Sequence, residues 1–293
     1  MPDLLGYGVV QTLNALSFSA LLLLNGLGLS VVLSLMNFVN LTHGAFYLLG
    51  SYVGIVWMGS GAPWWLAFPA AFLAAGLAGA LLERFPFRRF YAQPHLMQVL
   101  LTYGLSLIAA DLMRWGFGAQ IMTPELPDLL RGVVFLFDMP FPVFRLFLIG
   151  AGALLGLALW LLFDRTLWGA VLRAAVSDRG IVETLGIDTG RVFTLVLLLS
   201  AGLGGLSGAL GAGMLAAYPG LDEEVLLLAL VTVVVGGLGS FGGTVLGALV
   251  VGFALTFSKV WFPEFANLAA FAALIALLVA RPAGLIAPPL RRI

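Results

Sequence analysis

Long apolar runs separated by short polar segments make up most of this chain of 293 residues. An α-helix needs about 20 predominantly apolar residues to cross the ~30 Å hydrocarbon core of a membrane. Because the runs lack the two-residue alternation of barrel strands, they predict membrane-spanning helices. The runs that fit one crossing each are residues 13–35, 45–58, 64–82, 96–113, 142–163, 192–217 and 265–280. We therefore expect an all-α, polytopic transmembrane helical bundle that forms a single domain over residues 1–293.

A further apolar run, residues 224–257, is interrupted at its centre by glycines. As one helix it would measure ~51 Å, which is too long for a simple crossing. Glycine in a helix interior costs about 1 kcal/mol relative to alanine, so the helix is expected to break there. We predict two short helices that meet at a glycine turn, as a re-entrant or hairpin element. The residues of this second break are Gly236, Gly237, Gly239, Ser240, Gly242 and Gly243.

Polar side chains interrupt another apolar run near the start of the chain. Backbone that leaves a helix at membrane depth is tolerated only where protein buries it or where it lines a wet cavity. Two interpretations stay open: the side chains cap helix ends, for which Thr42 or Asn40 is suited, or they line a solute path. Paired breaks in the two halves of a chain are typical of transporters. The residues of this first break are Asn37, Asn40, Thr42, His43 and Gly44.

Arginines gather in three segments that connect or follow the predicted spans. These segments are residues 83–95, residues 164–191 and the tail from Arg281 onward. The positive-inside rule places all three in the cytoplasm. Acidic residues gather instead in residues 115–141 and 218–224, which we expect on the outside. The pattern leaves the side of the N-terminus open.

The cytoplasmic loop 164–191 contains a short amphipathic segment. Ser177 or Asp178 is a suitable N-cap, and Gly186 is suited to end the helix. Between them, Ile181, Val182 and Leu185 form an apolar face beside charged side chains. A two-turn amphipathic helix of this kind either lies on the membrane surface or docks in a groove of a partner.

Composition excludes several classes of protein and site. Hydrophobic residues make up 61% and charged residues 10%, against about 25% charged residues in soluble domains. The formal net charge of zero argues against a nucleic-acid partner, and the absence of cysteine excludes disulfides and thiolate metal sites. With only two histidines we expect no metal site. The spacing Gly237-x-Gly239-x-x-Gly242 lacks the strand and acidic residue of a dinucleotide site, and no catalytic constellation is present, so we expect no enzyme.

Small residues recur at every fourth position in the sixth predicted span. Such ladders let membrane helices approach closely, and we expect this one to pack against a helix of the same chain. Asp111 and Arg114 are spaced to pair on one helix face. The ladder consists of Ser200, Gly204, Gly208 and Ala212.

Four segments in order along the chain resemble one known family, the permeases of Liv-type ABC importers of branched-chain amino acids. They are Asn37-Phe-Val-Asn-Leu-Thr-His-Gly with the following Gly-Ser-Tyr, the loop 173–186, the glycine run 236–243 and Arg281-Pro-Ala-Gly-Leu. The resemblance covers residues 37–285 and is closest to the H-type permease subunit.

The resemblance implies a subunit of the bacterial inner membrane that works by alternating access. A second, usually non-identical permease would complete the pore within the lipid, two cytoplasmic ATPases would bind ATP and Mg²⁺, and a periplasmic binding protein would deliver the solute. This chain itself would bind no cofactor. The path would run along the two breaks, and a coupling helix would sit on the ATPase. By position that helix comprises Ser177, Asp178, Arg179, Ile181, Val182, Glu183, Thr184, Leu185 and Gly186.

Two questions stay open at this point. An ATP-independent secondary carrier or channel, with His43 as a proton relay, is the alternative to an ATP-driven importer. The solute of such a permease can be a leucine-like amino acid, or urea, an amide or an organic or aromatic acid. The shortage of charge in the predicted spans favours a neutral or zwitterionic solute.

Overall fold

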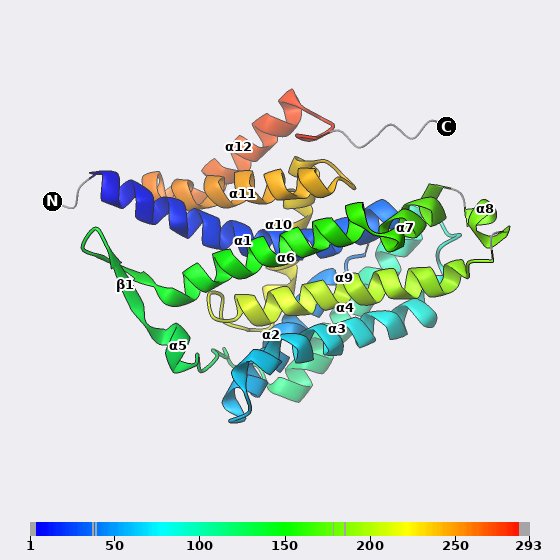
Figure 1. Ribbon diagram of the computed structural model, residues 1–293, viewed down its shortest axis with the longest axis horizontal. Coiled ribbons are helices and arrows are strands. Elements are labelled where there is room, and N and C mark those ends of the chain that lie inside the picture. Colours follow the sequence, from blue (N-terminus) through cyan, green and yellow to red (C-terminus); the bar gives the residue numbers. More distant parts are fainter. Residues whose placement is uncertain (1–3, 37, 39, 178, 185, 287–293) are drawn as a thin grey trace.

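The protein is a bundle of helices with a small β-hairpin at one end (Figure 1). The structure is a computed structural model that describes residues 4–36, 38, 40–177, 179–184 and 186–286. Seven helical segments of the described residues are long and apolar enough to cross a membrane, which confirms the expected all-α, polytopic membrane bundle. The helices and strands are α1 (Leu4–Met36), α2 (His43–Gly59), α3 (Ala67–Arg84), α4 (His95–Phe117), α5 (Asp128–Arg131), β1 (Val133–Leu136), β2 (Met139–Pro142), α6 (Val143–Arg165), α7 (Leu167–Ser177), α8 (Arg179–Thr184), α9 (Thr189–Gly211), α10 (Leu221–Gly236), α11 (Phe241–Trp261) and α12 (Ala266–Ala280), with short 3-10 turns at Trp64–Leu66, Phe87–Arg89 and Pro263–Phe265.

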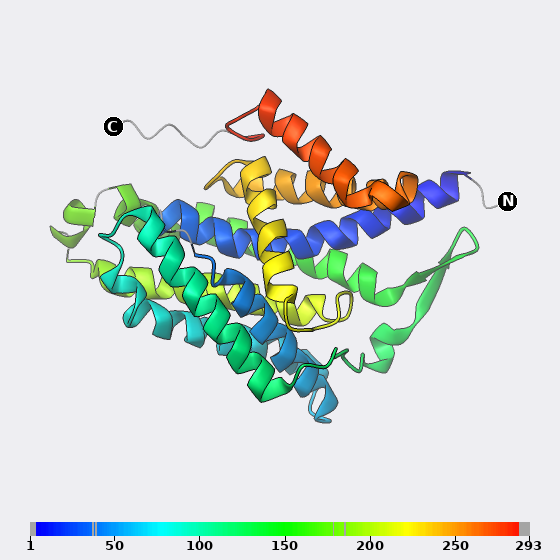
Figure 2. The same ribbon diagram turned by 180° about the vertical axis from the view of Figure 1, so that it is seen from behind.

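Helix α1 lies at the centre of the bundle. It contacts α6, α9, α10 and α11, and its apolar side chains are enclosed by them. Helices α1, α6, α9 and α11 run side by side, whereas α10 crosses them steeply (Figures 1 and 2). A helix that is apolar on all sides needs apolar surroundings on all sides. For α1 other helices provide them, whereas α4 and α12 expose Leu107 and Ile275 as a lipid-facing helix would.

The packing at one end of the bundle places the end of α1 beside the arginine-rich segments. Val31 and Val32 near the end of α1 share a buried cluster with Phe87, Val182 and Val192. Phe87 and Val182 belong to the arginine-rich segments and Val192 directly follows one of them, so we call this end of the bundle the arginine-rich end. If that end is cytoplasmic by the positive-inside rule, α1 enters the membrane from the outside.

The apolar run after α9 forms a helical hairpin, as predicted, but its two helices differ in length. Helix α10 has 16 residues and α11 has 21. Helix α11 is long enough for a complete crossing, so the expectation of two short helices is wrong for α11. The glycine turn between them lies beside Ser34 of α1, where a Cβ added to Gly239 would be 3.1 Å from the Ser34 Cβ. Because this turn lies near the arginine-rich end, the hairpin starts and ends toward the opposite side of the bundle.

Two elements were not expected from the sequence. The hairpin β1–β2 turns at Phe137 and Asp138, which both have positive φ, without the Asn-Gly that usually marks such a turn. Helix α7 follows α6 after a bend at Thr166, and Gly169 in its first turn packs so closely that a Cβ would lie 1.8 Å from the Phe163 carbonyl oxygen. Asp111 and Arg114 both belong to the described residues but form no ion pair, so the predicted pair is wrong.

Candidate functional site

The first break brings the chain back into the bundle. Helix α1 ends at Met36, yet α2 begins at His43, whose ring lies against Asn25 and Gly28 of α1. Asn25 precedes the end of α1 by 11 residues, or ~16 Å of helix. Helix α2 therefore starts well inside the bundle and runs outward from there. The predicted break is confirmed, although Asn37 falls outside the described residues.

The polar side chains of the first break bond to the protein around them. The Asn40 Oδ1 accepts the Thr42 N–H at 3.1 Å, and the Thr42 hydroxyl donates to the Thr102 carbonyl of α4 at 3.0 Å. Of the two expected caps, Thr42 holds the N-cap position of α2 but makes no capping bond, whereas the side chain of Asn40 accepts the N–H of Thr42 itself. The Thr42 hydroxyl instead ties the break to α4, and the His43 N–H donates to the Asn40 carbonyl at 3.4 Å.

His43 is enclosed between two helices. Its Nε2 lies 3.0 Å from the Asn25 carbonyl oxygen. Because a carbonyl only accepts, Nε2 carries the hydrogen, and in the neutral ring Nδ1 is then an acceptor. A Cβ added to Gly28 or Gly204 would lie 2.8 or 3.2 Å from the ring. The ring is thus fixed in one orientation by α1 and α9.

The ladder of small residues on α9 packs within the chain, as predicted. A Cβ on Gly208 would lie 1.9 Å from the Tyr47 carbonyl oxygen, and one on Gly50 would lie 2.0 Å from the Gly205 carbonyl oxygen. Helices α2 and α9 therefore touch through their backbones. This contact fixes the depth at which α2 begins.

The second break is a turn that the C-terminal segment covers. Gly237 and Gly239 have φ of 109° and 77°, and the Ser240 hydroxyl caps α11 by accepting the Gly243 N–H at 3.1 Å. The N–H groups of Leu285 and Ile286 then donate to the last carbonyls of α10, those of Val235 and Gly236, at 2.9 and 3.0 Å. The segment after Arg281 thus supplies the partners that the end of α10 lacks.

The start of α2 and the glycine turn lie beside different parts of α1. His43, at the end of the first break, lies beside Asn25 and Gly28, whereas Gly239 of the second break lies beside Ser34, nearer the arginine-rich end. What approaches the first break is the opposite end of α10: a Cβ on Gly44 would lie 2.1 Å from the Asp222 carbonyl oxygen. No sequence pattern predicted this contact between α2 and the start of α10.

Alanine at Gly237 is expected to loosen this turn. A side chain there has an unfavourable positive φ, and its Cβ would fall 2.0 Å from the Ile286 carbonyl oxygen. We expect Gly237→Ala to cost about 1–3 kcal/mol of stability and to free the C-terminal segment. Thermal unfolding in detergent and protease cleavage after Arg281 measure both effects. Gly59→Ala, where no atom lies within 4 Å, is the control, and equal behaviour of the two variants would contradict the assignment.

The short helix predicted in the loop 164–191 is present as α8. The Gly186 N–H donates to the Glu183 carbonyl at 3.0 Å, and the Ile187 N–H donates to the Val182 carbonyl at 3.3 Å. With φ of +80° at Gly186, this is the Schellman pattern, so Gly186 ends the helix as predicted. The expected cap Asp178 and the expected contact Leu185 lie outside the described residues, and Ser177 is the last residue of α7.

The described side chains of α8 face in two directions. Val182 is buried in the bundle together with Leu172 and Val192. Glu183 and Thr184 are exposed, and a carboxylate oxygen of Glu183 accepts a hydrogen bond from the Thr189 hydroxyl in the first turn of α9. Helix α8 is therefore anchored to the bundle by one face and leaves Glu183 and Thr184 accessible at the arginine-rich end.

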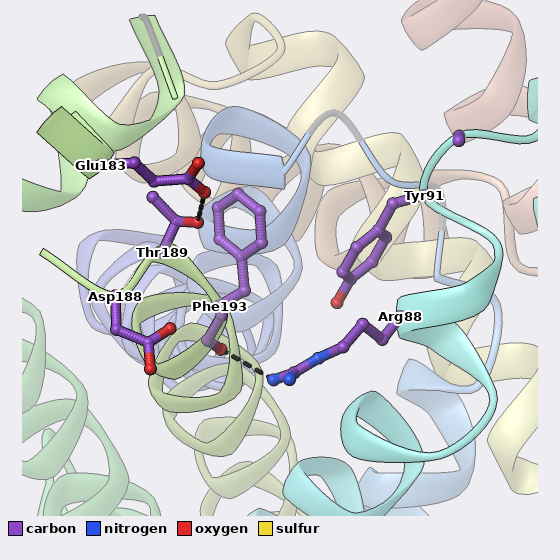
Figure 3. Close-up of a pocket in the computed structure, with 8 residues that line it drawn as sticks. Arg88, Tyr91, Glu183, Asp188, Thr189 and Phe193 are labelled. Carbon is purple, nitrogen blue, oxygen red and sulfur yellow. Dashed lines mark hydrogen bonds between the residues drawn. The ribbon is translucent and has the colours of Figure 1, made fainter. Parts of the chain in front are cut away.

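A cavity of about 440 Å³ lies between α8 and the loop before α4. Figure 3 shows Arg88 and Tyr91 on one side of it and Glu183, Thr189 and Phe193 on the other. The cavity opens at the arginine-rich end, beside the accessible face of α8. The residues that line it are Arg88, Tyr91, Ala92, Glu183, Asp188, Thr189, Gly190 and Phe193.

A buried carboxylate organises the wall of this cavity. The side chain of Glu83, at the end of α3, is completely buried and accepts bonds from Nε and Nη2 of Arg88 at 3.2 Å each. It also accepts from the hydroxyls of Tyr91 and Thr194, and Arg88 donates to the Gly190 carbonyl at 3.0 Å. We call this set the Glu83 network. It joins the end of α3 to the first turn of α9, and sequence reasoning missed it, although an acidic residue five positions before an arginine was visible.

Comparison with known proteins agrees with this architecture. Residues 11–280 match the family described as "Branched-chain amino acid transport system / permease component". The high-affinity branched-chain amino acid transport system permease protein LivH of Escherichia coli is 25% identical, covering 97% of this chain and 96% of the relative. BraD of Pseudomonas aeruginosa, named as the same kind of permease protein, is 25% identical over 99% of this chain and 98% of its own.

A third relative comes from another organism. The probable branched-chain amino acid transport permease protein LivH of Methanocaldococcus jannaschii is 25% identical over 82% of this chain and 77% of its own. No solved structure gives a significant match. The family match extends from α1 to the end of α12 and so includes both breaks and α8. The chain therefore belongs to the family of branched-chain amino acid transport system permease components.

Proposed function

We propose that this chain is the permease subunit of an ATP-driven importer for branched-chain or similarly apolar amino acids in a bacterial inner membrane. The observation that carries the proposal is the family match over residues 11–280, which spans every membrane helix of the bundle. The names of the relatives support the solute class, since LivH and BraD are both named as branched-chain amino acid permease proteins.

The resemblance to permeases of ABC importers implies the partners of this chain. ATP and Mg²⁺ would bind to two separate cytoplasmic ATPase subunits, which agrees with a sequence that has no Gly-x4-Gly-Lys-Ser/Thr phosphate loop. A second permease subunit would complete the pore, and a periplasmic protein would deliver the amino acid. The accessible face of α8, with Glu183 and Thr184, is the element that we propose to contact an ATPase.

Contacts in the structure connect α8 to the membrane helices, so a movement of α8 would be transmitted to them. Helix α8 is anchored through Val182 and through the bond between Glu183 and Thr189. Thr189 opens α9, and the Glu83 network ties the same turn of α9 to α3. A displacement of α8 by an ATPase would therefore move α9 and α3 together, and α9 carries the backbone contact with α2.

The test uses the complete transporter, purified with its partner subunits and reconstituted in liposomes. The double variant Glu183→Arg with Leu185→Asp is expected to abolish ATP-dependent leucine uptake and to release the ATPase subunits on gel filtration. Asp128→Arg, which changes an exposed carboxylate in the segment between α4 and α6, is the control and should transport normally.

Two results would contradict the proposal. Leucine uptake by the chain alone, without ATP, would favour the secondary carrier or channel. Normal uptake and normal ATPase binding by the double variant would remove α8 from the coupling role.

A further inference from the structure

Buried polar atoms without a partner gather where α1, α2 and α10 meet. Three of them are Asn25 Oδ1, His43 Nδ1 and Asp222 Oδ1. Their residues are 1%, 0% and 3% exposed, so solvent does not reach them in this structure. An unpaired buried polar atom is unfavourable, and one that persists in a folded protein calls for an explanation.

Contacts between the three elements bring these atoms into one region. The His43 Nε2 donates to the Asn25 carbonyl at 3.0 Å, and the Asn25 Nδ2 donates to the Val225 carbonyl at 3.3 Å. Val225 follows Asp222 by three residues, so both lie on the same face of α10. The Asp222 carbonyl in turn touches Gly44, the neighbour of His43. We call these three side chains the acceptor cluster.

The free atoms of the acceptor cluster share one chemistry. Asn25 uses its amide N–H₂ on Val225, which leaves its oxygen. His43 donates through Nε2, which leaves Nδ1 as a lone-pair acceptor. Asp222 contributes a carboxylate oxygen. All three accept hydrogen bonds, so a bound group that satisfies them must donate several, as an ammonium group does.

The start of α2 lies next to the acceptor cluster and favours a negatively charged group. His43 opens α2 and donates its N–H to the Asn40 carbonyl, whereas Thr42 makes no side-chain bond to the N–H groups that follow. The first turn of a helix presents unpaired N–H groups and the positive end of the helix dipole, which favour a carboxylate. Helix α2 has 17 residues, so its dipole is well developed. A group of acceptors beside an uncapped helix start matches a molecule that carries an ammonium and a carboxylate on the same carbon atom.

We propose that the acceptor cluster and the start of α2 bind the ammonium and carboxylate of an amino-acid zwitterion during its passage through the membrane. The inference rests on the proposed function and extends it, because it names the groups of the protein that would bind the solute within the membrane. The apolar side chain of the solute would lie toward Leu226, whose Cβ is 3.0 Å from a Cβ added to Gly44. In this structure the site is closed, and α10 and α2 must separate to load it.

The decisive variant is Asp222→Asn. It removes the charge that would hold the ammonium, yet its amide supplies the hydrogen-bond donor that the acceptor cluster lacks. We expect leucine binding to weaken about tenfold or more, as for loss of a charge-assisted bond. We expect the melting temperature to stay the same or rise. Glu223→Gln is the matched control, because Glu223 is the exposed neighbour on the same turn.

The measurement is equilibrium binding of radiolabelled L-leucine to the purified complete transporter without its binding protein. Competition by 3-methylbutylamine and 4-methylpentanoate, which are leucine without its carboxylate and without its ammonium, separates the two halves of the site. In the wild type both should compete more weakly than leucine. In Asp222→Asn, 3-methylbutylamine should lose the most.

Three outcomes overturn the inference. They are wild-type leucine affinity in Asp222→Asn, a melting temperature that falls together with binding, or an equal loss in Glu223→Gln. Leucine uptake in liposomes shows whether only the binding site is wrong or the proposed function as well. If the wild type takes up leucine with ATP and Asp222→Asn binds it normally, only the binding site is wrong. If the wild type transports no amino acid, both are wrong.

Discussion

Gly50→Ala is expected to destabilise the protein strongly, whereas Gly104→Ala is expected to leave it unchanged or more stable. A methyl group on Gly50 would lie 2.0 Å from the Gly205 carbonyl oxygen and 2.3 Å from the Gly205 Cα. Both are backbone atoms, so α2 and α9 must move apart to admit it. Overpacking of this kind costs about 1–3 kcal/mol or more.

Gly104 provides the matched comparison. It lies in the middle of α4, where no atom would touch an added Cβ. Alanine there gains up to about 1 kcal/mol of helix propensity. Thermal unfolding of the two purified variants in the same detergent measures the difference. Equal melting temperatures would show that α2 and α9 do not touch through their backbones.

Arg88→Ala is expected to be the second large perturbation, and a larger one than Glu83→Gln. The Glu83 side chain is completely buried, whereas that of Arg88 is 45% exposed. Removal of Arg88 leaves a buried carboxylate without its cation, for which about 3 kcal/mol is expected, the lower end for a broken buried pair. Glu83→Gln retains an acceptor and removes the buried charge, so about 1 kcal/mol is expected.

The same variants test the role of the Glu83 network in coupling. Because Arg88 joins the end of α3 to the first turn of α9, its loss should lower the number of leucine molecules moved per ATP in the reconstituted transporter. Arg89→Ala, the exposed neighbour, should stay within about 0.5 kcal/mol of the wild type and transport normally. A normal ratio of transport to ATP hydrolysis in Arg88→Ala would leave the network with a structural role alone.

The sequence predictions were correct for features that depend on neighbouring residues and failed for features that depend on contacts with the rest of the structure. The spans and the two breaks were predictable because they depend on local properties, the length of apolar runs and the cost of glycine in a helix. The end of α8 at Gly186 was also predictable, since a Schellman cap needs only a residue that tolerates positive φ. The hairpin β1–β2 was missed because its turn residues, Phe137 and Asp138, are held at positive φ without the usual turn sequence.

The candidate site was predictable only in part. His43 and Gly44 were recognised from a polar interruption, but their neighbours Asn25 and Asp222 come from helices far away in the sequence. Asn25 lies within an apolar helix, and Asp222 is one of three consecutive acidic residues, so neither stood out. Thr42 was expected to cap α2, but a longer-range bond to the Thr102 carbonyl of α4 replaced that local role.

By itself, the sequence determined that this protein is a helical membrane bundle, where its helices break and which loops carry the positive charge. These properties follow from hydrophobicity and backbone preference, which act within about 20 residues. Only the tertiary structure decided that the start of α10 meets the start of α2, that the C-terminal segment covers the glycine turn and that Glu83 is buried against Arg88. The physical reason is that each of these depends on close packing between distant segments, where a missing Cβ or a single carbonyl sets the distance.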